Sequence, residues 1–149
     1  MIGLLQRVSH AQVTVDGAVI AAIGRGLLVL VGVENGDDKI QAERLLERVL
    51  GYRVFPDEAG KMNLSLRDID GGLLLVPQFT LAADTGKGAR PSFSSAAPPE
   101  IGRALFDHMV ARARAQYPHV GCGRFGAEME VTLTNEGPVT FWLRVAPQT

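Results

Sequence analysis

The feature that most constrains the fold is a continuous apolar run over residues 27–33, LLVLVGV, which is bounded by Gly26 and Gly36. A strand with one face in solvent alternates apolar and polar residues, and this run shows no such alternation. The run therefore predicts a strand that is buried on both faces. With 46% apolar residues in a chain of 149, the sequence can supply the core that such a strand needs.

Other strands are predicted on both sides of this run. Residues 11–15 alternate polar and apolar side chains before Asp16-Gly17, a pair that tolerates the positive φ of tight turns, so a hairpin is expected there. Residues 72–76 predict a second buried strand that runs into 78–81. Near the end of the chain, period-two alternation predicts two strands, 129–134 and 139–145, joined through 135–138.

Two amphipathic helices are predicted between the strands. The first follows the capping candidates Asp37 and Asp38 and extends to Leu50. The second starts after Pro98-Pro99-Glu100 and stops near Tyr117-Pro118, because proline disfavours the helical state of the residue before it. Its apolar stripe is expected to contain Ile101, Leu105, Phe106, Met109, Val110 and Ala113.

This order of elements indicates a single α/β (α+β) domain over residues 1–149, with an antiparallel or mixed sheet and two main helices packed on it. Residues 82–98 form a loop of unusual length between the second buried strand and the second helix. Structureless loops of that length are uncommon inside compact domains, so this one is a candidate for a functional role.

The composition excludes several classes of protein. Cys122 is the only cysteine, so it can neither close an internal disulfide nor form a zinc site alone. The histidines, at positions 10, 108 and 119, lack the spacing of metal ligands, and no metal or other cofactor is expected. No apolar run approaches the length that spans a bilayer, so we expect a cytoplasmic protein without a membrane partner.

The charge is close to balanced, at −1 overall, which argues against a protein that holds DNA or other nucleic acid mainly by neutralising phosphates. Residues 82–125 nevertheless carry six basic and three acidic side chains. This segment could face a polyanion, or it could be ordinary solvated surface.

Two short motifs stand at informative places. Gln78-Phe79-Thr80-Leu81 lies where a buried strand meets the long loop, and strand ends leave backbone N–H groups free for a ligand. The alternative is that Phe79 and Leu81 belong to the core and that Thr80 reflects β propensity. Gly137-Pro138 lies between two predicted strands, where a simple turn would also explain it.

Taken together, the motifs QFTL at 78–81, RPSF at 90–93 and NEGPVT at 135–140, with Arg7 near the start, resemble the D-aminoacyl-tRNA deacylases of the bacterial and eukaryotic type. The resemblance extends to MIGLLQRV at the amino terminus and GKMNLS at 60–65, so it covers the whole chain. It implies a barrel-like rolled sheet and a homodimer without a cofactor. The implied activity is hydrolysis of the ester between a D-amino acid, or glycine, and the terminal adenosine of tRNA. L-aminoacyl-tRNA is left intact, and the activity serves translation quality control.

The resemblance also assigns roles to particular residues. In that family the Gly-Pro of NxGPVT is a cis peptide that enters the other subunit's pocket and binds the substrate's amino group, a role that falls on Gly137 and Pro138. The family arginine that supports this turn corresponds to Arg7. The catalytic segment corresponds to Gln78, Phe79 and Thr80, with backbone donors and an aromatic contact to adenine. Independently of the resemblance, the local excess of positive charge makes Lys87 and Arg90 candidates for tRNA binding.

Pro77 departs from the family pattern, which has serine before QFTL. A hydroxyl and a backbone N–H are both absent at that position, so any hydrogen bond that the family makes there is lost. Proline is admissible at an irregular strand position, and the fold is expected to tolerate it.

The residues leave two mechanisms open for the predicted reaction. An aminoacyl ester is already activated, so aligned water and N–H donors to the developing oxyanion would suffice. Thr80 acting as a nucleophile is the rival mechanism, but no base stands near it in the sequence. A non-catalytic module that binds RNA 3′ ends or nucleotides, with Phe79 and Phe93 as stacking platforms, is the alternative function.

Overall fold

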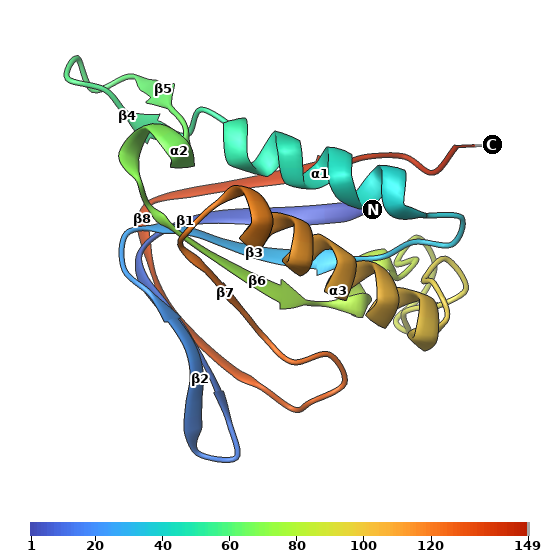
Figure 1. Cartoon of the computed structure of the whole chain (residues 1–149). Helices are drawn as coiled ribbons and strands as arrows, with labels where there is room; N and C mark the ends of the chain where they lie inside the picture. The colour runs from blue at the N-terminus through green and yellow to red at the C-terminus, as the bar shows by residue number, and fades with distance from the viewer. Residues whose placement is uncertain (149) are drawn as a thin grey trace.

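Six strands form one mixed β-sheet in the computed structural model, which describes residues 1–148 (Figure 1). The elements are β1 (Ile2–Val15), β2 (Ala18–Ile23), β3 (Gly26–Gly32), α1 (Lys39–Gly51), β4 (Phe55–Pro56), β5 (Met62–Leu64), α2 (Leu66–Ile69), β6 (Gly72–Pro77), the 3-10 helix η1 (Phe79–Ala82), α3 (Pro99–Gln116), β7 (Val120–Cys122) and β8 (Glu130–Arg144).

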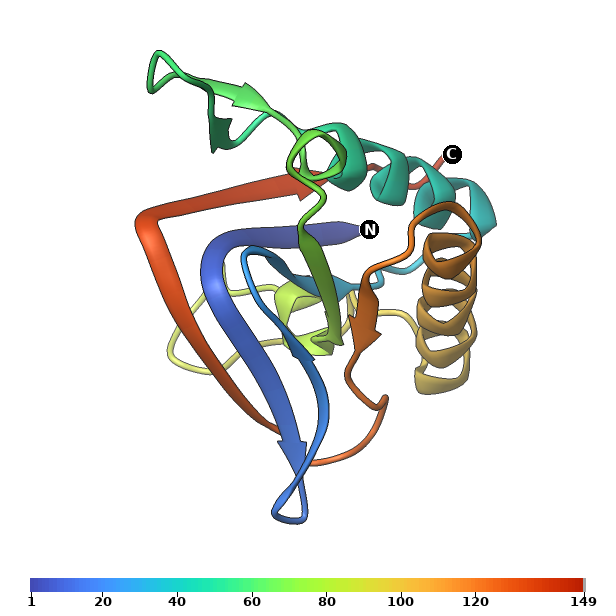
Figure 2. The same cartoon turned by 60° about the vertical axis from the view of Figure 1, so that its left-hand side comes forward.

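The strand order is β2-β1-β3-β6-β7. β8 pairs with β1 along the edge opposite to the one that pairs with β2 and β3. β3 pairs parallel with β6, and β6 parallel with β7, whereas β1 pairs antiparallel with β2, β3 and β8. The sheet curls until β2 and β7 contact each other, so it is nearly closed into a barrel (Figure 2). Within residues 1–148 no ladder of hydrogen bonds joins β2 to β7, and we call this open join the seam.

Two hydrophobic cores lie on the two faces of the curled sheet. Leu27, Val29 and Val31 of β3 pack in the core beneath α1 and α3, which cover the outer face of the sheet (Figure 1). Leu28 points the other way, into the barrel interior with Val13 and other residues. The predicted strand with two buried faces is therefore confirmed, and it forms the wall between the two cores.

Both predicted helices are confirmed, and their ends have clear causes. The Asp38 carboxylate caps α1 by accepting from Ile40 N–H at 2.8 Å, while Gln41 accepts from Asp38 N–H at 2.7 Å in a reciprocal capping box. In α3 the predicted stripe is buried except for Ile101, which is 43% exposed. Gly102 is buried instead. It lies so close to Phe125 that an added Cβ would be 3.3 Å from that ring.

The end of the chain differs from the prediction of two strands. β8 is one strand that pairs with β1 on both sides of residues 135–138, where the register shifts. The alternation of buried and exposed residues continues past this irregularity, with Leu133 and Phe141 more buried than their neighbours. The turn-like residues therefore produce a bulge within a strand and do not separate two strands.

The amino terminus is held by a buried ion cluster beside β3. The Met1 ammonium, which is fully buried, donates to Glu34 Oε2 at 3.0 Å, to Asp37 at 2.9 Å and to the Val145 carbonyl at 2.7 Å. Arg144 Nε donates to the same Glu34 oxygen at 2.9 Å. Burial alone would raise the pKa of Glu34, but the hydrogen bonds from Arg144 and the ammonium outweigh it and lower that pKa below its ordinary value of 4.5.

This cluster predicts a specific pH dependence of stability. Because the folded pKa of Glu34 is lowered, its contribution is fully present above pH 4.5 and is lost as the pH falls through the folded value. We expect Glu34→Gln to lower the unfolding free energy by about 1–3 kcal/mol near neutral pH. Urea unfolding at about pH 7 and about pH 3.5 should show a smaller pH effect in this variant than in wild type.

Glu47→Gln is the matched control, because Glu47 is exposed on α1. It should keep the wild-type pH dependence. Equal pH dependence in wild type and Glu34→Gln would contradict the role given to the cluster.

Candidate functional site

The chain turns sharply where β6 ends. Gln78 N–H donates to the Val31 carbonyl at 2.8 Å, and the next residues form η1 instead of the predicted continuation of the strand. The turn packs closely on β3, since a side chain at Gly32 would lie 2.9 Å from Leu81 Cβ. The first N–H groups of such a helix, those of Phe79 and Thr80, have no acceptor within its own turn.

Phe79 is 57% exposed, so it does not belong to the core. Its ring lies 5.3 Å from that of Phe93, centroid to centroid, with the planes tilted by 49°. Phe93 comes from the long loop and is also exposed. Two large aromatic rings are therefore presented to solvent beside free backbone donors, which favours binding of a planar group.

Thr80 is exposed, and its hydroxyl oxygen accepts a hydrogen bond from the Gln78 amide nitrogen. An amide donor withdraws electron density from the hydroxyl oxygen and cannot take its proton. Among residues 1–148, no histidine, carboxylate or amine is hydrogen-bonded to this hydroxyl. The local contacts therefore do not supply the base that a nucleophilic threonine needs.

A cavity of about 490 Å³ opens beside Gln78 and Phe79. Its walls come from the ends of β3 and β6, the start of α3 and the segment between β7 and β8. Most of the lining is apolar, including Val31, Val33, Ala97, Phe106, Phe125 and Met129. An apolar hollow with a few polar groups at its rim is the usual form of a small-molecule site.

The bulge in β8 contains the second motif. The Gly137-Pro138 peptide is cis, as the family resemblance implies. The buried Arg7 side chain donates from Nε to the Glu136 carbonyl at 3.1 Å and from Nη1 to the Val54 carbonyl at 2.7 Å. Arg7 thus holds the bulge against the segment after α1.

The two motifs do not meet within one chain. Gly137 and Pro138 are exposed, and neither is among the residues that line the cavity beside Gln78 and Phe79. If both motifs act on one ligand, the bulge must reach a cavity other than that of its own chain.

Lys87 and Arg90 are both exposed on the long loop. The loop is pinched by reciprocal backbone hydrogen bonds between Asp84 and Ser92, and its far end is tied to Asn35. The structure therefore places the two basic residues at the tip of a closed loop next to η1.

The N–H that Pro77 lacks falls where the sheet needs no donor. Gln78 N–H points to β3, so the nitrogen of Pro77 points to the β7 side of β6. β7 pairs with β6 only as far as Leu75, so the ladder ends before Pro77. This geometry explains how the fold accommodates proline at the position where the family has serine.

The sequence did not identify the residues that build the cavity. The apolar stripe of the second predicted helix includes Phe106 as a core position, and no pattern in the sequence marks Phe125 or Met129 as a cavity wall. Gly102 was the one signal in the sequence. Glycine destabilises a helix, so a glycine at the fourth position of α3 suggests that a neighbouring group leaves no room for a side chain.

Comparisons with known proteins agree over nearly the whole chain. A family described as "D-Tyr-tRNA(Tyr) deacylase" matches residues 4–144. The "D-aminoacyl-tRNA deacylase" of Nitrosococcus oceani is 64% identical over 99% of this chain and 95% of its own length. The protein of the same name from Stutzerimonas stutzeri is 66% identical over 96% of this chain and 99% of its own.

Two solved structures share the fold. One, titled "c-Myc DNA Unwinding Element Binding Protein", has a TM-score of 0.93 and 38% identity, covering 98% of this chain and 99% of its own. The other, titled as a probable eukaryotic D-amino acid tRNA deacylase, has a TM-score of 0.75 and 20% identity, covering 95% and 97%. The second similarity establishes the fold alone.

The geometry of the bulge predicts the effect of a side chain at Gly137. Its φ of +123° is rarely adopted by other residues, and an added Cβ would lie 2.8 Å from Val139 Cγ2 and 3.1 Å from Arg7 Nη2. We expect Gly137→Ala to lower the unfolding free energy by about 1–3 kcal/mol in urea titrations. Gly51→Ala is the control, because nothing lies near its Cβ. Equal stabilities of the two variants would contradict a rigid bulge.

Proposed function

The chain belongs to the D-Tyr-tRNA(Tyr) deacylase family, and we propose that it hydrolyses the ester bond of D-aminoacyl-tRNA to release the D-amino acid and free tRNA. The observation that carries this conclusion is the identity of about two thirds, over nearly the full length, with proteins named D-aminoacyl-tRNA deacylase. The protein is thus a hydrolase that acts on ester bonds.

The turn at η1 supports a mechanism based on the main chain. When water attacks the ester carbonyl, negative charge develops on the carbonyl oxygen. The bond between the acyl carbon and the ribose oxygen then breaks, and the ribose oxygen takes the proton that the attacking water gives up. The free N–H groups of Phe79 and Thr80 are suited to stabilise that charge. A single donor of this kind contributes about 10²–10³ in rate, and the activated ester needs no charged catalyst beside it.

The contacts of Thr80 favour this mechanism over covalent catalysis. Its hydroxyl is engaged by the amide of Gln78, which also positions the start of η1 through its backbone bond to Val31. In this proposal Gln78 fixes the turn, and Thr80 contributes its main-chain N–H.

The cavity beside Phe79 is suited to the terminal adenosine of the tRNA. A purine is flat and largely apolar on its faces, and the walls at Phe106, Phe125 and Met129 offer apolar surface of that kind. Phe79 and Phe93 stand exposed at the entrance, where base stacking on aromatic rings contributes about 1–3 kcal/mol.

Chiral selection is assigned to the bulge at Gly137-Pro138. If its carbonyl oxygens bind the substrate's amino group while η1 binds the carbonyl, the remaining substituent at the α-carbon can point in only one of two directions. A wall on the L side then rejects L-aminoacyl-tRNA, whereas D-amino acids and glycine are accepted. Arg7 supports this role by holding the bulge in place.

This arrangement requires a homodimer. Because the bulge does not line its own chain's cavity, it must enter that of a second copy. A two-fold axis would place the bulge of each subunit at the cavity of the other, so that one isologous interface contains two equivalent sites.

Lys87 and Arg90 are proposed to bind the tRNA next to the site, because their loop is tied to Asn35 and packs beside η1. We place the reaction in the cytoplasm, where charged tRNA is used. Within residues 1–148, no helix is long and apolar enough to cross a membrane.

A non-catalytic module for RNA 3′ ends is the second candidate, and the exposed pair Phe79 and Phe93 is the observation that favours it. Turnover separates the two functions. A deacylase releases many D-amino acids per protein molecule from charged tRNA, whereas a binding module protects the ester or leaves it unchanged.

We predict that Thr80→Ala and Thr80→Val keep most of the wild-type rate in single-turnover hydrolysis of D-aminoacyl-tRNA. Both variants remove the hydroxyl and retain the main-chain N–H. Loss of the chemical step in both would establish Thr80 as a side-chain catalyst and contradict the main-chain mechanism.

Exchange of the bulge between subunits predicts complementation in mixed dimers. Gly137→Ala damages the bulge and Phe79→Ala damages the cavity, so each variant alone should be nearly inactive. When equal amounts are unfolded and refolded together, half of the dimers are mixed, and each has one intact site, which restores about a quarter of wild-type activity. No recovery, or sedimentation only at the chain mass of 16.0 kDa, would contradict the homodimer.

A further inference from the structure

Three cavities follow one another along the side of the molecule, and each shares lining residues with the next. The cavity at Gln78 and Phe79 shares the walls Phe106 and Phe125 with a second cavity along α3. That second cavity shares Ile20, Arg114 and Cys122 with a third one between β2 and β7. The seam groove, as we name this path, therefore leads from the candidate active site to the open seam of the barrel.

Four arginines line the seam groove beyond the active-site cavity: Arg103, Arg114, Arg124 and Arg25. All four are exposed, and none forms an ion pair with another residue of the described part of the chain. The acidic groups in the groove are Asp107 and Asp70, and Asp70 is engaged with His119 at 3.1 Å. The groove thus carries an excess of unpaired positive charge.

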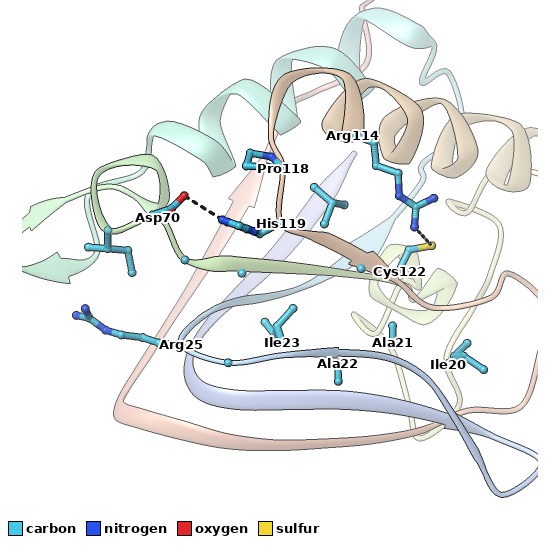
Figure 3. Close-up of a pocket in the computed structure, with 16 residues that line it drawn as sticks. Ile20, Ala21, Ala22, Ile23, Arg25, Asp70, Arg114, Pro118, His119 and Cys122 are labelled. Carbon is cyan, nitrogen blue, oxygen red and sulfur yellow. Dashed lines mark hydrogen bonds and ion pairs between the residues drawn. The ribbon is translucent and has the colours of Figure 1, made fainter.

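The arginines are arranged along the groove and do not converge on one point. Arg103 lies over the Phe125 ring at 5.0 Å, next to the active-site cavity. Figure 3 shows the far part, where Arg114 reaches from α3 toward Cys122, with 3.6 Å between Nη2 and Sγ, and Arg25 lies at the opposite end. Arg114 lies eleven positions after Arg103 on α3, which corresponds to a rise of about 16 Å.

The opposite face of α3 makes a useful contrast. Arg112 approaches the Glu43 carboxylate of α1 to 3.4 Å, so this arginine already has an acidic partner in the same chain. Within the described residues the four groove arginines have no such carboxylate partner. Unpaired guanidinium groups spaced along a groove are suited to the successive phosphates of a nucleic-acid strand, whereas a single small anion would need them clustered.

We propose that the seam groove binds the phosphodiester backbone of the tRNA acceptor end that leads away from the terminal adenosine. This inference rests on the proposed function, because the groove begins at the cavity assigned to that adenosine. At about 3.4 Å per phosphate, the spacing along one strand of B-DNA, the stretch from Arg103 to Arg114 corresponds to about five phosphates.

The proposal predicts a loss that depends on the length of the substrate. Arg114→Gln with Arg124→Gln should raise KM for D-aminoacyl-tRNA severalfold and leave kcat nearly constant. The loss should be much smaller for a D-aminoacyl ester of adenosine alone, which has no upstream phosphates. The slope of log affinity against log salt should become shallower by about one for each phosphate contact removed.

Arg112→Gln is the matched control on the same helix, since its side chain lies outside the groove. Affinity for uncharged tRNA, measured by filter binding, separates the groove from the chemistry. If wild type binds tRNA but hydrolyses no D-aminoacyl ester, the proposed function fails, while binding by the variants still tests the groove. Equal KM and salt slope for the double variant and Arg112→Gln, or an equal loss on the adenosine ester, would overturn the groove proposal.

Discussion

The two hydrogen bonds of Arg7 are the interaction on which the candidate site most depends. A single buried guanidinium joins the bulge of β8 to the segment after α1, through the carbonyls of Glu136 and Val54. β1 carries this arginine in the middle of its length, where its pairing with β8 shifts register. The planar guanidinium supplies these two donors in a fixed geometry, whereas the three donors of a lysine ammonium rotate about a flexible stem. The bulge is therefore held in a defined position although Gly137 and Pro138 themselves are exposed.

The proposed mechanism draws on backbone atoms more than on side chains. η1 presents N–H groups because β6 ends at Gln78 and the chain turns at once, and the bulge presents carbonyls because β8 cannot pair regularly there. Main-chain groups of this kind are fixed by the fold and need no rotamer change to act, which is the condition for electrostatic preorganisation. The proposed site can therefore use the main chain around Gln78 and Thr80 without a charged side chain as catalyst.

Elements set by local pattern were predictable, and elements set by tertiary contact were not. The run at 27–33 and the capping residue Asp38 predicted β3 and α1 because burial and capping act locally. The hairpin β4–β5 and the short helix α2 gave no periodic signal, since two to four residues are too few for one. The residues 135–138 suggested a break between strands, and only the pairing with β1 shows that one strand continues. Likewise the site motifs could be recognised from their letters, whereas the cavity walls at Phe106, Phe125 and Met129 depend on how distant segments pack.

The central claim is that the main chain of η1 from one subunit and the bulge of the other hold one substrate between them. A crystal structure with a stable amide analogue of 3′-D-aminoacyl-adenosine tests it most directly. The account predicts the analogue's carbonyl oxygen at the N–H groups of Phe79 and Thr80, its adenine in the cavity, and its amino group at the partner subunit's Gly-Pro bulge. An analogue whose carbonyl carbon instead faces the Thr80 hydroxyl, or which contacts a single chain only, would contradict the account.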